Sequence, residues 1–419
     1  SRHKWYLEDF INYSPGGDNG PKHNYEEVDV YSLNSNFRKG DFFLGSETVY
    51  NRVLSTTDNL ANNALATRYP DNGSGVFSTA FYVNIFKRLS HQIQFEGGLR
   101  YTYSYLFGDY RPDENDIGGV DIRDVWSALG EANSLSNHII SGNIKFVYYP
   151  NEAWKISSVT SRGFHAPNVD DMYKVFVKGD NITVPYKSLR PEYALSQEIS
   201  VSKKISDQIS IHAIGFVTRI QDAIIKDTLF YDANPDPDYE YLISNMMYDG
   251  DIFTSFANQN SLSPVYISGL TVGLNANVSG FLINQDINIT QASDKDGSRG
   301  PYAHIPPLFG KTEFIKAIDS WKVRFLCLYA GPKKAEDYDY AGVDNIDETP
   351  LIELDEDGNE IWAGNPAWFT LSLSIKNQVT DNLSLQIGVD NMLDAHYKTF
   401  GSGISAPGRS LVYTAKFSF

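Results

Sequence analysis

The sequence has almost no cysteine, since Cys327 is the single one among 419 residues. One thiol cannot form a disulfide framework or supply a cysteine-based zinc or iron–sulfur site. Long apolar runs are also missing, because the longest, residues 325–330, falls far short of the roughly 18 residues that a membrane-spanning helix needs. The sequence therefore excludes disulfide scaffolds, thiolate metal centres and helical membrane proteins.

Positive charge is scarce as well. The chain has 35 Lys and Arg residues against 52 Asp and Glu residues, which gives a formal net charge of -17. This balance argues against a nucleic-acid binder, because phosphate contacts need clustered cations. The sequence starts at Ser1 without a Met, a basic segment or an apolar run, so no targeting signal can be read. We expect either that a signal was removed or that the chain is a fragment of a longer protein.

Alternation of apolar and polar residues with a period of two is the dominant pattern, and it predicts strands with one apolar and one polar face. On the last strand the apolar face carries Leu411, Tyr413, Ala415, Phe417 and Phe419. The opposite face carries Ser410, Thr414, Lys416 and Ser418, with Val412 as the exception. The class is therefore all-β.

Fifteen such segments can be drawn along the chain. They are residues 24–38, 41–57, 74–88, 91–107, 134–149, 154–164, 190–205, 209–228, 263–278, 281–293, 305–317, 321–331, 366–379, 383–397 and 408–419. Many are longer than the five or six residues that are usual for soluble strands.

The connections between these segments alternate strictly between tight turns and long loops. The long loops are residues 58–73, 108–133, 165–189, 229–262, 294–304, 332–365 and 398–407. Short turns at one end and long loops at the other are typical of a transmembrane antiparallel up-and-down β-barrel. We therefore expect a protein of the outer membrane of a Gram-negative bacterium, in contact with its lipid. A large extracellular all-β protein is the alternative.

Motifs near the C-terminus carry a family resemblance. The run from Val389 to Tyr397, followed by residues 406–409 and Phe419, resembles the closing strands of TonB-dependent outer-membrane transporters. Residues 161–168 with 189–192, and residues 304–310, resemble further stretches of the same barrel. The motif residues Phe164, Ala166, Pro167, Asn391, Asp394, Pro407, Gly408, Arg409 and Phe419 are expected to build the barrel rather than to bind substrate. Asn391 and Asp394 are expected to hydrogen-bond and turn the chain.

The resemblance implies a plugged barrel of about 22 strands. Counted back from the C-terminus, residues 1–419 are then its last fifteen or sixteen strands, with residues 5–10 as the external end of the extra one. The first six or seven strands and the N-terminal plug are expected to be absent from this sequence. That plug would contact the TonB–ExbB–ExbD complex, which the resemblance names as the energy-coupling partner.

Within this family, residues 47–55, 164–172 and 397–409 are most similar to haemoglobin and haem receptors of Bacteroides-like bacteria. In those receptors a histidine of the mid-barrel loop is a haem ligand, but residues 168–184 contain no histidine. Since His or Tyr can ligate haem iron, we name His165, Tyr173 and His304 as ligand-binding candidates. Haem or an iron chelate would be cargo, so no resident cofactor and no metal site is expected.

The resemblance implies a TonB-coupled importer of a scarce iron-containing nutrient, with haem as the leading substrate. The haem could come from haemoglobin or another haem protein, and a surface lipoprotein is a possible accessory partner. A siderophore or other metal chelate is the alternative cargo. From other classes, a passive porin of about sixteen strands and an enzyme built into the barrel are alternatives. We expect no enzyme and no catalytic residues, because no nucleophile–base pair can be assigned.

Overall fold

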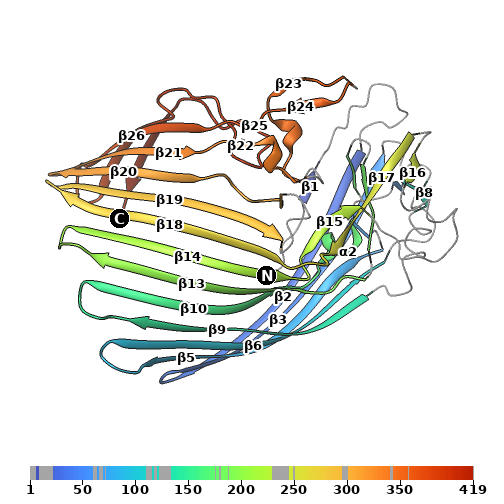
Figure 1. The fold of residues 1–419 in the computed structure, drawn as a ribbon, viewed down its shortest axis with the longest axis horizontal. Coiled ribbons are helices and arrows are strands. Elements are labelled where there is room, and N and C mark those ends of the chain that lie inside the picture. Colours follow the sequence, from blue (N-terminus) through green and yellow to red (C-terminus); the bar gives the residue numbers. More distant parts are fainter. Residues whose placement is uncertain are drawn as a thin grey trace.

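The computed structural model describes most of the chain. The described residues are 6–8, 22–59, 64–65, 69–70, 72–109, 116–117, 120–121, 134–174, 176–178, 181–186, 188–228, 245–248, 251–294, 301–339, 343–356 and 358–418. Long antiparallel strands, each paired with its neighbours along the chain, make one strongly curved sheet (Figure 1). None of the helices in these residues is long and apolar enough to cross a membrane.

The main sheet contains 17 of the strands within the described residues. The fifteen long ones, in the order in which they pair, are β2 (Lys22–Lys39), β3 (Phe42–Asn59), β5 (Ser74–Arg88), β6 (Ile93–Gly108), β9 (Ser134–Tyr148), β10 (Trp154–His165), β13 (Glu192–Lys204), β14 (Ile209–Gln221), β18 (Val265–Val278), β19 (Phe281–Asp294), β20 (Phe309–Ile318), β21 (Trp321–Ala330), β26 (Trp368–Gln378), β27 (Leu383–Asp390) and β28 (Ser410–Phe417). Two short strands complete it, β1 (Tyr6–Glu8) beside β2 and β4 (Ala64–Leu65) beside β3.

The all-β antiparallel class is therefore confirmed, and a strand forms in each of the fifteen predicted segments. Two predicted boundaries were wrong. The segment 209–228 is divided into β14 and β15 (Ile224–Thr228), because Asp222 takes a left-handed φ of 55° that a strand cannot continue through. The segment 383–397 ends as a strand at Asp390, because Asn391 has φ 47°.

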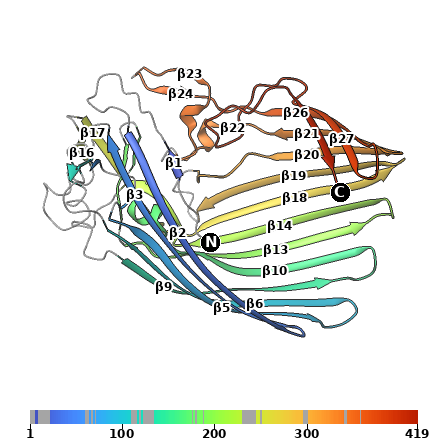
Figure 2. The same cartoon turned by 180° about the vertical axis from the view of Figure 1, so that it is seen from behind.

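The tight turns gather at one end of the sheet and the long connections at the other (Figures 1 and 2). The long connections have structure of their own. A second sheet contains β11 (Phe176–Lys178), β12 (Asn181–Thr183), β15, β16 (Asn245–Tyr248) and β17 (Asp251–Asn260). Three two-stranded sheets pair β7 (Asp116–Ile117) with β8 (Val120–Asp121), β22 (Lys333–Lys334) with β25 (Gly364–Asn365), and β23 (Leu351–Leu354) with β24 (Glu360–Trp362).

The strand register separates the two faces of the sheet. Across β27 and β28, Leu383 stands opposite Phe417, and Ser384 stands opposite Lys416. Because neighbouring strands keep the same alternation, apolar residues fall on one face and polar residues on the other. The predicted alternation of the last strand is confirmed for residues 410–418, and Phe419 lies outside the described residues.

We call the polar face inner and the apolar face outer. On β6, Thr102 and Ser104 of the inner face are buried, each with 4% exposure. Leu99 and Tyr101 of the outer face are exposed. The long connections cover the inner face near the end of the sheet at which they lie, which is why polar side chains are buried there.

Candidate functional site

The connection from β10 to β13 begins with a short helix, α2 (Val169–Tyr173), which Asn168 caps at its N-terminus. Asn168 Oδ1 accepts the backbone N–H of Asp171 at 3.1 Å, and Asp171 Oδ2 accepts that of Asn168 at 2.9 Å. This reciprocal capping box fixes the start of the helix. Asn258 of β17 donates from Nδ2 to the backbone oxygen of Asp171 at 3.1 Å, so β17 holds the helix from the other side.

His165 is the last residue of β10 and lies on the inner face beside this helix. Its Nε2 is 2.8 Å from Asp171 Oδ2, the same carboxylate oxygen that accepts the N–H of Asn168. The side chain of His165 is 44% exposed, while that of Asp171 is 16% exposed. The carboxylate of Asp171 therefore orients the ring of His165 through Nε2. Nδ1 is the ring nitrogen that does not contact this carboxylate.

Tyr173 occupies a different environment from the two histidine candidates. It is fully buried with Leu106, Met172 and Leu189 in a hydrophobic cluster. A Cβ added at Gly108 would lie 2.8 Å from the ring of Tyr173, so the ring packs directly on the strand backbone. Burial, together with the charges of Tyr105 and Asp109, raises the pKa of Tyr173 well above its ordinary value. In this conformation Tyr173 is a protonated phenol that anchors α2 to β6.

His304 lies in the connection that leads into β20, and a buried carboxylate orients it. Its φ of 64° is left-handed, and its backbone N–H points at both carboxylate oxygens of Asp344, at 3.0 and 2.9 Å. The ring Nδ1 is 2.9 Å from Asp344 Oδ1, and the side chains of His304 and Asp344 are 76% and 0% exposed. With Nδ1–H donating to the carboxylate, the neutral ring carries its lone pair on Nε2.

Asp344 is itself held in place by its own loop. The carboxylate of Asp339 accepts the backbone N–H groups of Val343 and Asp344, each at 3.1 Å. These bonds fix the backbone that leads into Asp344, whose carboxylate holds His304. The carboxylate of Asp339 therefore supports that of Asp344.

Lys333 ties the loop of β22 to the same connection. Its Nζ donates to the backbone oxygen of Ile305 at 2.6 Å and lies 4.3 Å from the ring centre of Phe400. Burial lowers the pKa of Lys333, and the nearby Asp344 opposes that shift. Burial also raises the pKa of Tyr338, the other ring beside this ammonium group, to about 12.

These connections border an inner-face cleft of about 450 Å³. Its walls include α2, the beginning of β15, the loop end of β18 and the connection that carries His304. The lining residues include Asp170, Asp171, Lys174, Glu192, Ile220, Ile224, Lys226, Val265, Ile267, Tyr302 and His304. The structure thus brings His304 and the carboxylate that holds His165 to one cleft. Tyr173 is not among the lining residues.

Sequence reasoning missed the two orienting carboxylates. The capping-box spacing from Asn168 to Asp171 was a readable signal for a helix start, although not for a partner of His165. Nothing local pairs Asp344 with His304, since they are far apart in the sequence and meet only through the folding of two loops.

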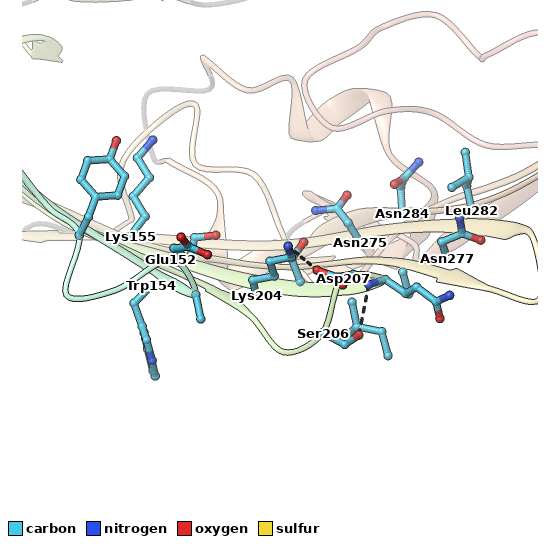
Figure 3. A pocket seen from close by; sticks show the side chains of 17 residues that line it. Glu152, Trp154, Lys155, Lys204, Ser206, Asp207, Asn275, Asn277, Leu282 and Asn284 are labelled. Atoms are coloured by element: carbon cyan, nitrogen blue, oxygen red, sulfur yellow. Dashed lines mark hydrogen bonds and ion pairs between the residues drawn. The ribbon is translucent and has the colours of Figure 1, made fainter. Parts of the chain in front are cut away.

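A second recess of about 440 Å³ lies at the tight-turn end (Figure 3). Asn275, Asn277 and Asn284 point into it from β18 and β19, whereas Trp154 points to the opposite side of the sheet from Lys155. At its edge Lys204 pairs with Asp207 at 2.7 Å. The residues that line the recess are therefore mostly polar, unlike those of the outer face behind it.

Several charges of the inner wall pair within the sheet itself. Arg100 Nη2 is 2.6 Å from Glu47 Oε2, and Lys145 Nζ is 3.0 Å from Glu96 Oε2. The first ion pair reaches across β5 to join β3 with β6, and the second joins the neighbouring strands β6 and β9. The charges of Glu96 and Arg100 are therefore satisfied by the barrel wall.

The motif residues near the C-terminus form a tight turn after β27. Asn391 Nδ2 donates to the backbone oxygens of Ala395 at 2.9 Å and Pro407 at 3.2 Å. Asp394 Oδ1 accepts the backbone N–H of Arg409 at 2.7 Å. A Cβ on Gly408 would lie 2.8 Å from Asp394 Oδ1, so a larger residue there would displace this carboxylate. In the mid-barrel motif, Phe164 and Ala166 are half-buried and Pro167 is buried.

Long strands with alternating faces, tight turns at one end and structured loops at the other define the class of membrane-type β-barrel walls. The chain belongs to the TonB-dependent receptor family, because the family model described as "TonB dependent receptor-like, beta-barrel" matches residues 2–392. This confirms the family part of the resemblance. Members of this family are receptors and transporters, so the chain is not an enzyme. No functionally curated protein matches the sequence.

Solved structures of the same class share the fold at low sequence identity. The copper transporter OprC has a TM-score of 0.68 and 15% identity over 95% of this chain and 58% of its own. The iron transporter FrpB from Neisseria meningitidis has a TM-score of 0.62 and 12% identity over 96% of this chain and 56% of its own. The haemophore receptor HasR from Serratia marcescens, solved with haemophore HasA and haem, has a TM-score of 0.60 and 13% identity over 95% of this chain and 60% of its own. The chain thus spans less than two thirds of each.

Proposed function

We propose that the chain is the C-terminal part of the barrel of a TonB-dependent importer in the outer membrane of a Gram-negative bacterium, and that its cargo is haem. Family membership supports the transport class. The apolar outer face and the polar inner face support a wall between lipid and lumen. Haem, free or taken from a carrier protein, is the cargo that the geometry of His304 favours.

The pairing of His304 with Asp344 carries this proposal. Histidines that bind metals usually donate their other ring N–H to a carboxylate, which orients the ring and raises the basicity of the ligating nitrogen. His304 has this arrangement, with Nδ1 on a fully buried carboxylate and an exposed ring that offers Nε2. Imidazole is a common axial ligand of haem iron.

The cleft beside His304 suits a flat, partly apolar ligand. Its volume of about 450 Å³ lies within the usual range of ligand pockets. Ile220, Val265 and Ile267 supply apolar wall, and Lys226 is a cation on a wall that also carries carboxylates. Lys174 pairs with one of these, Asp170, at 3.2 Å. His165 and Tyr173 remain further ligand candidates. His165 already lies beside the cleft through Asp171, whereas Tyr173 would have to leave its buried position.

Energy coupling needs a plug in addition to the barrel wall that these residues form. We propose a separate plug segment of roughly 100–150 residues, the size of an ordinary domain, which would contact TonB and through it ExbB and ExbD. The polar recess of Figure 3 and the charged inner wall are surfaces on which such a plug could hydrogen-bond. A haem-carrying protein or a surface lipoprotein would meet the loop end.

The test replaces the proposed ligand in the complete transporter. His304→Ala should abolish the absorption band of histidine-ligated haem and raise the Kd for haem at least tenfold, because the iron loses an axial ligand. His91→Ala is the matched control, since His91 is exposed at a tight turn far from the cleft. Unchanged haem spectra in the His304 variant, with the barrel folded, would contradict the assignment.

A ferric siderophore or another metal chelate is the second candidate cargo. The cleft lining carries Lys174 and Lys226 beside the carboxylates of Asp170, Asp171, Glu192 and Asp339, and this polar wall can hydrogen-bond a chelate as well as haem. Titration of the same protein with a ferric catecholate and a ferric hydroxamate separates the two cargoes. Tight binding of a chelate that His304→Ala leaves unchanged would favour this candidate over haem.

A further inference from the structure

The outer face carries cations at two levels of β10 and β13. At the tight-turn end Lys203 Nζ lies 4.7 Å from the ring centre of Trp154, and at the loop end Arg162 lies 4.2 Å from that of Tyr193. Positions 154 and 162 are separated by about 26 Å of strand at about 3.3 Å per residue. At a strand tilt of about 40° this is a height of about 20 Å, close to the apolar band of about 25 Å in outer-membrane barrels.

The strand register places a second arginine at the upper level. Arg162 stands opposite Leu195 of β13, and Leu195 stands opposite Arg219 of β14. The two arginines are therefore two strand spacings apart, about 10 Å between Cα atoms, with one leucine between them. Tyr266 of β18 continues the same row beside Arg219. Both arginines are exposed, and Leu195 is 51% exposed.

Neither arginine has a carboxylate partner in the part of the chain that the structure describes. Arg162 donates from Nη1 to the backbone oxygen of Ile140 at 2.6 Å, and its guanidinium group lies over the ring of Tyr193. Other charged pairs of the sheet are satisfied, as Arg100 with Glu47 shows. The outer face thus holds two cations whose anion must come from outside these residues.

Polar groups just below this row behave differently. Thr160 Oγ1 donates to Gln197 Oε1 at 2.5 Å, and Gln197 Nε2 donates to Ser158 Oγ at 3.0 Å. These outward polar side chains therefore satisfy one another's hydrogen-bonding groups within the apolar band. The arginines above them do not pair in this way, which marks their row as the level where the surroundings change from apolar to charged.

We infer that Arg162 and Arg219 bind the phosphate of an anionic membrane lipid at the loop-end edge of the apolar band. A guanidinium group matches phosphate oxygens with two parallel N–H donors. Tyr193 and Tyr266 suit the interface between headgroups and acyl chains, where aromatic residues gather. Leu195 and Ile199, exposed further down β13, offer an apolar path for an acyl chain. The inference rests on the proposed membrane location but not on the cargo.

Arg52 provides a matched control on the same face. It is an exposed outer-face residue of β3, but it stands directly opposite Asp29 of β2. A carboxylate at that register position competes with any lipid phosphate. Replacing Arg52 removes an outward arginine without touching the row of Arg162 and Arg219.

The experiment measures lipid binding to the complete transporter in mild detergent by native mass spectrometry. The probes are dimyristoylphosphatidylglycerol, zwitterionic dimyristoylphosphatidylcholine and inorganic phosphate. R162Q/R219Q should weaken binding of the anionic lipid about tenfold or more, whereas R52Q should leave it unchanged. R162K/R219K should lie between these, because it keeps the charge and loses the two-pronged donor geometry.

Several results would overturn the inference. The phosphate site would be disproved if the parent protein bound the two lipids equally well. It would also be disproved if R162Q/R219Q bound the anionic lipid as tightly as the parent protein does. If inorganic phosphate bound as tightly as the lipid, the acyl chains would have no role in binding. The lipid site and the haem cargo can be tested separately. R162Q/R219Q should bind haem normally, and His304→Ala should bind the lipid normally.

Discussion

Asp344 and His304 come from two different loops, and the fully buried carboxylate of Asp344 holds both the backbone N–H and the ring Nδ1 of His304. One acidic side chain thus fixes the position and the tautomer of an exposed imidazole. Asp344→Asn keeps the shape of the side chain but removes its charge. We expect haem affinity to fall by about 10–100-fold, as for other orienting partners of metal-binding histidines. Haem titration followed by absorbance measures the effect.

The control for this variant is Glu353→Gln, which changes an exposed charge on β23 of the same loop. It should leave haem affinity unchanged. Equal affinities of the Asp344 variant and the parent protein would show that the carboxylate does not support the ligand.

Tyr173 distinguishes packing from ligation. Tyr173→Phe keeps the buried ring and removes only the hydroxyl, so haem binding should be unchanged if the residue anchors α2. Tyr173→Ala should cost about 3–5 kcal/mol locally, the usual range for deletion of a buried aromatic ring. We then expect faster proteolysis within residues 165–189, measured by mass spectrometry of the fragments. A loss of haem ligation in the Phe variant would instead support Tyr173 as a ligand.

The two faces of β28 predict opposite responses to a charge. Tyr413 is 70% exposed on the outer face, opposite Ile387 of β27. Tyr413→Arg should destabilise the barrel in lipid by about 2–4 kcal/mol if the position lies near the bilayer midplane. Thr414→Arg, one residue along on the inner face, should have a much smaller effect. Reversible urea unfolding in lipid vesicles compares them, and equal losses would contradict the assignment of faces.

Gly408 predicts a local steric effect. An alanine there would place its Cβ 2.8 Å from Asp394 Oδ1, which accepts the N–H of Arg409. Gly408→Ala should therefore break this hydrogen bond and destabilise the protein by about 1–3 kcal/mol. Gly388→Ala is the control on β27, since its nearest contact would be an ordinary 3.5 Å. Denaturant unfolding of both variants tests the difference, and equal midpoints would show that the turn can shift.

The strands, their two faces and the alternation of turns and loops could be predicted from the sequence. Each of these depends on residues close together in the chain, because side chains alternate sides at every step of a strand. The turn after β27 was readable for the same reason, since Asn391 and Asp394 act on backbone groups a few residues away or in the next short loop.

Which side chains meet could be read from the folded structure alone. The break at Asp222 depends on contacts from distant residues, as Asn260 Nδ2 donates to its backbone oxygen at 2.7 Å and Arg190 pairs with its carboxylate at 2.7 Å. The burial of Tyr173 and the pairing of Asp344 with His304 depend on how loops fold over the inner face. The row from Arg162 to Arg219 depends on the register across three strands. Local alternation cannot specify these contacts, because they are set by strand register and by loops that are distant in sequence.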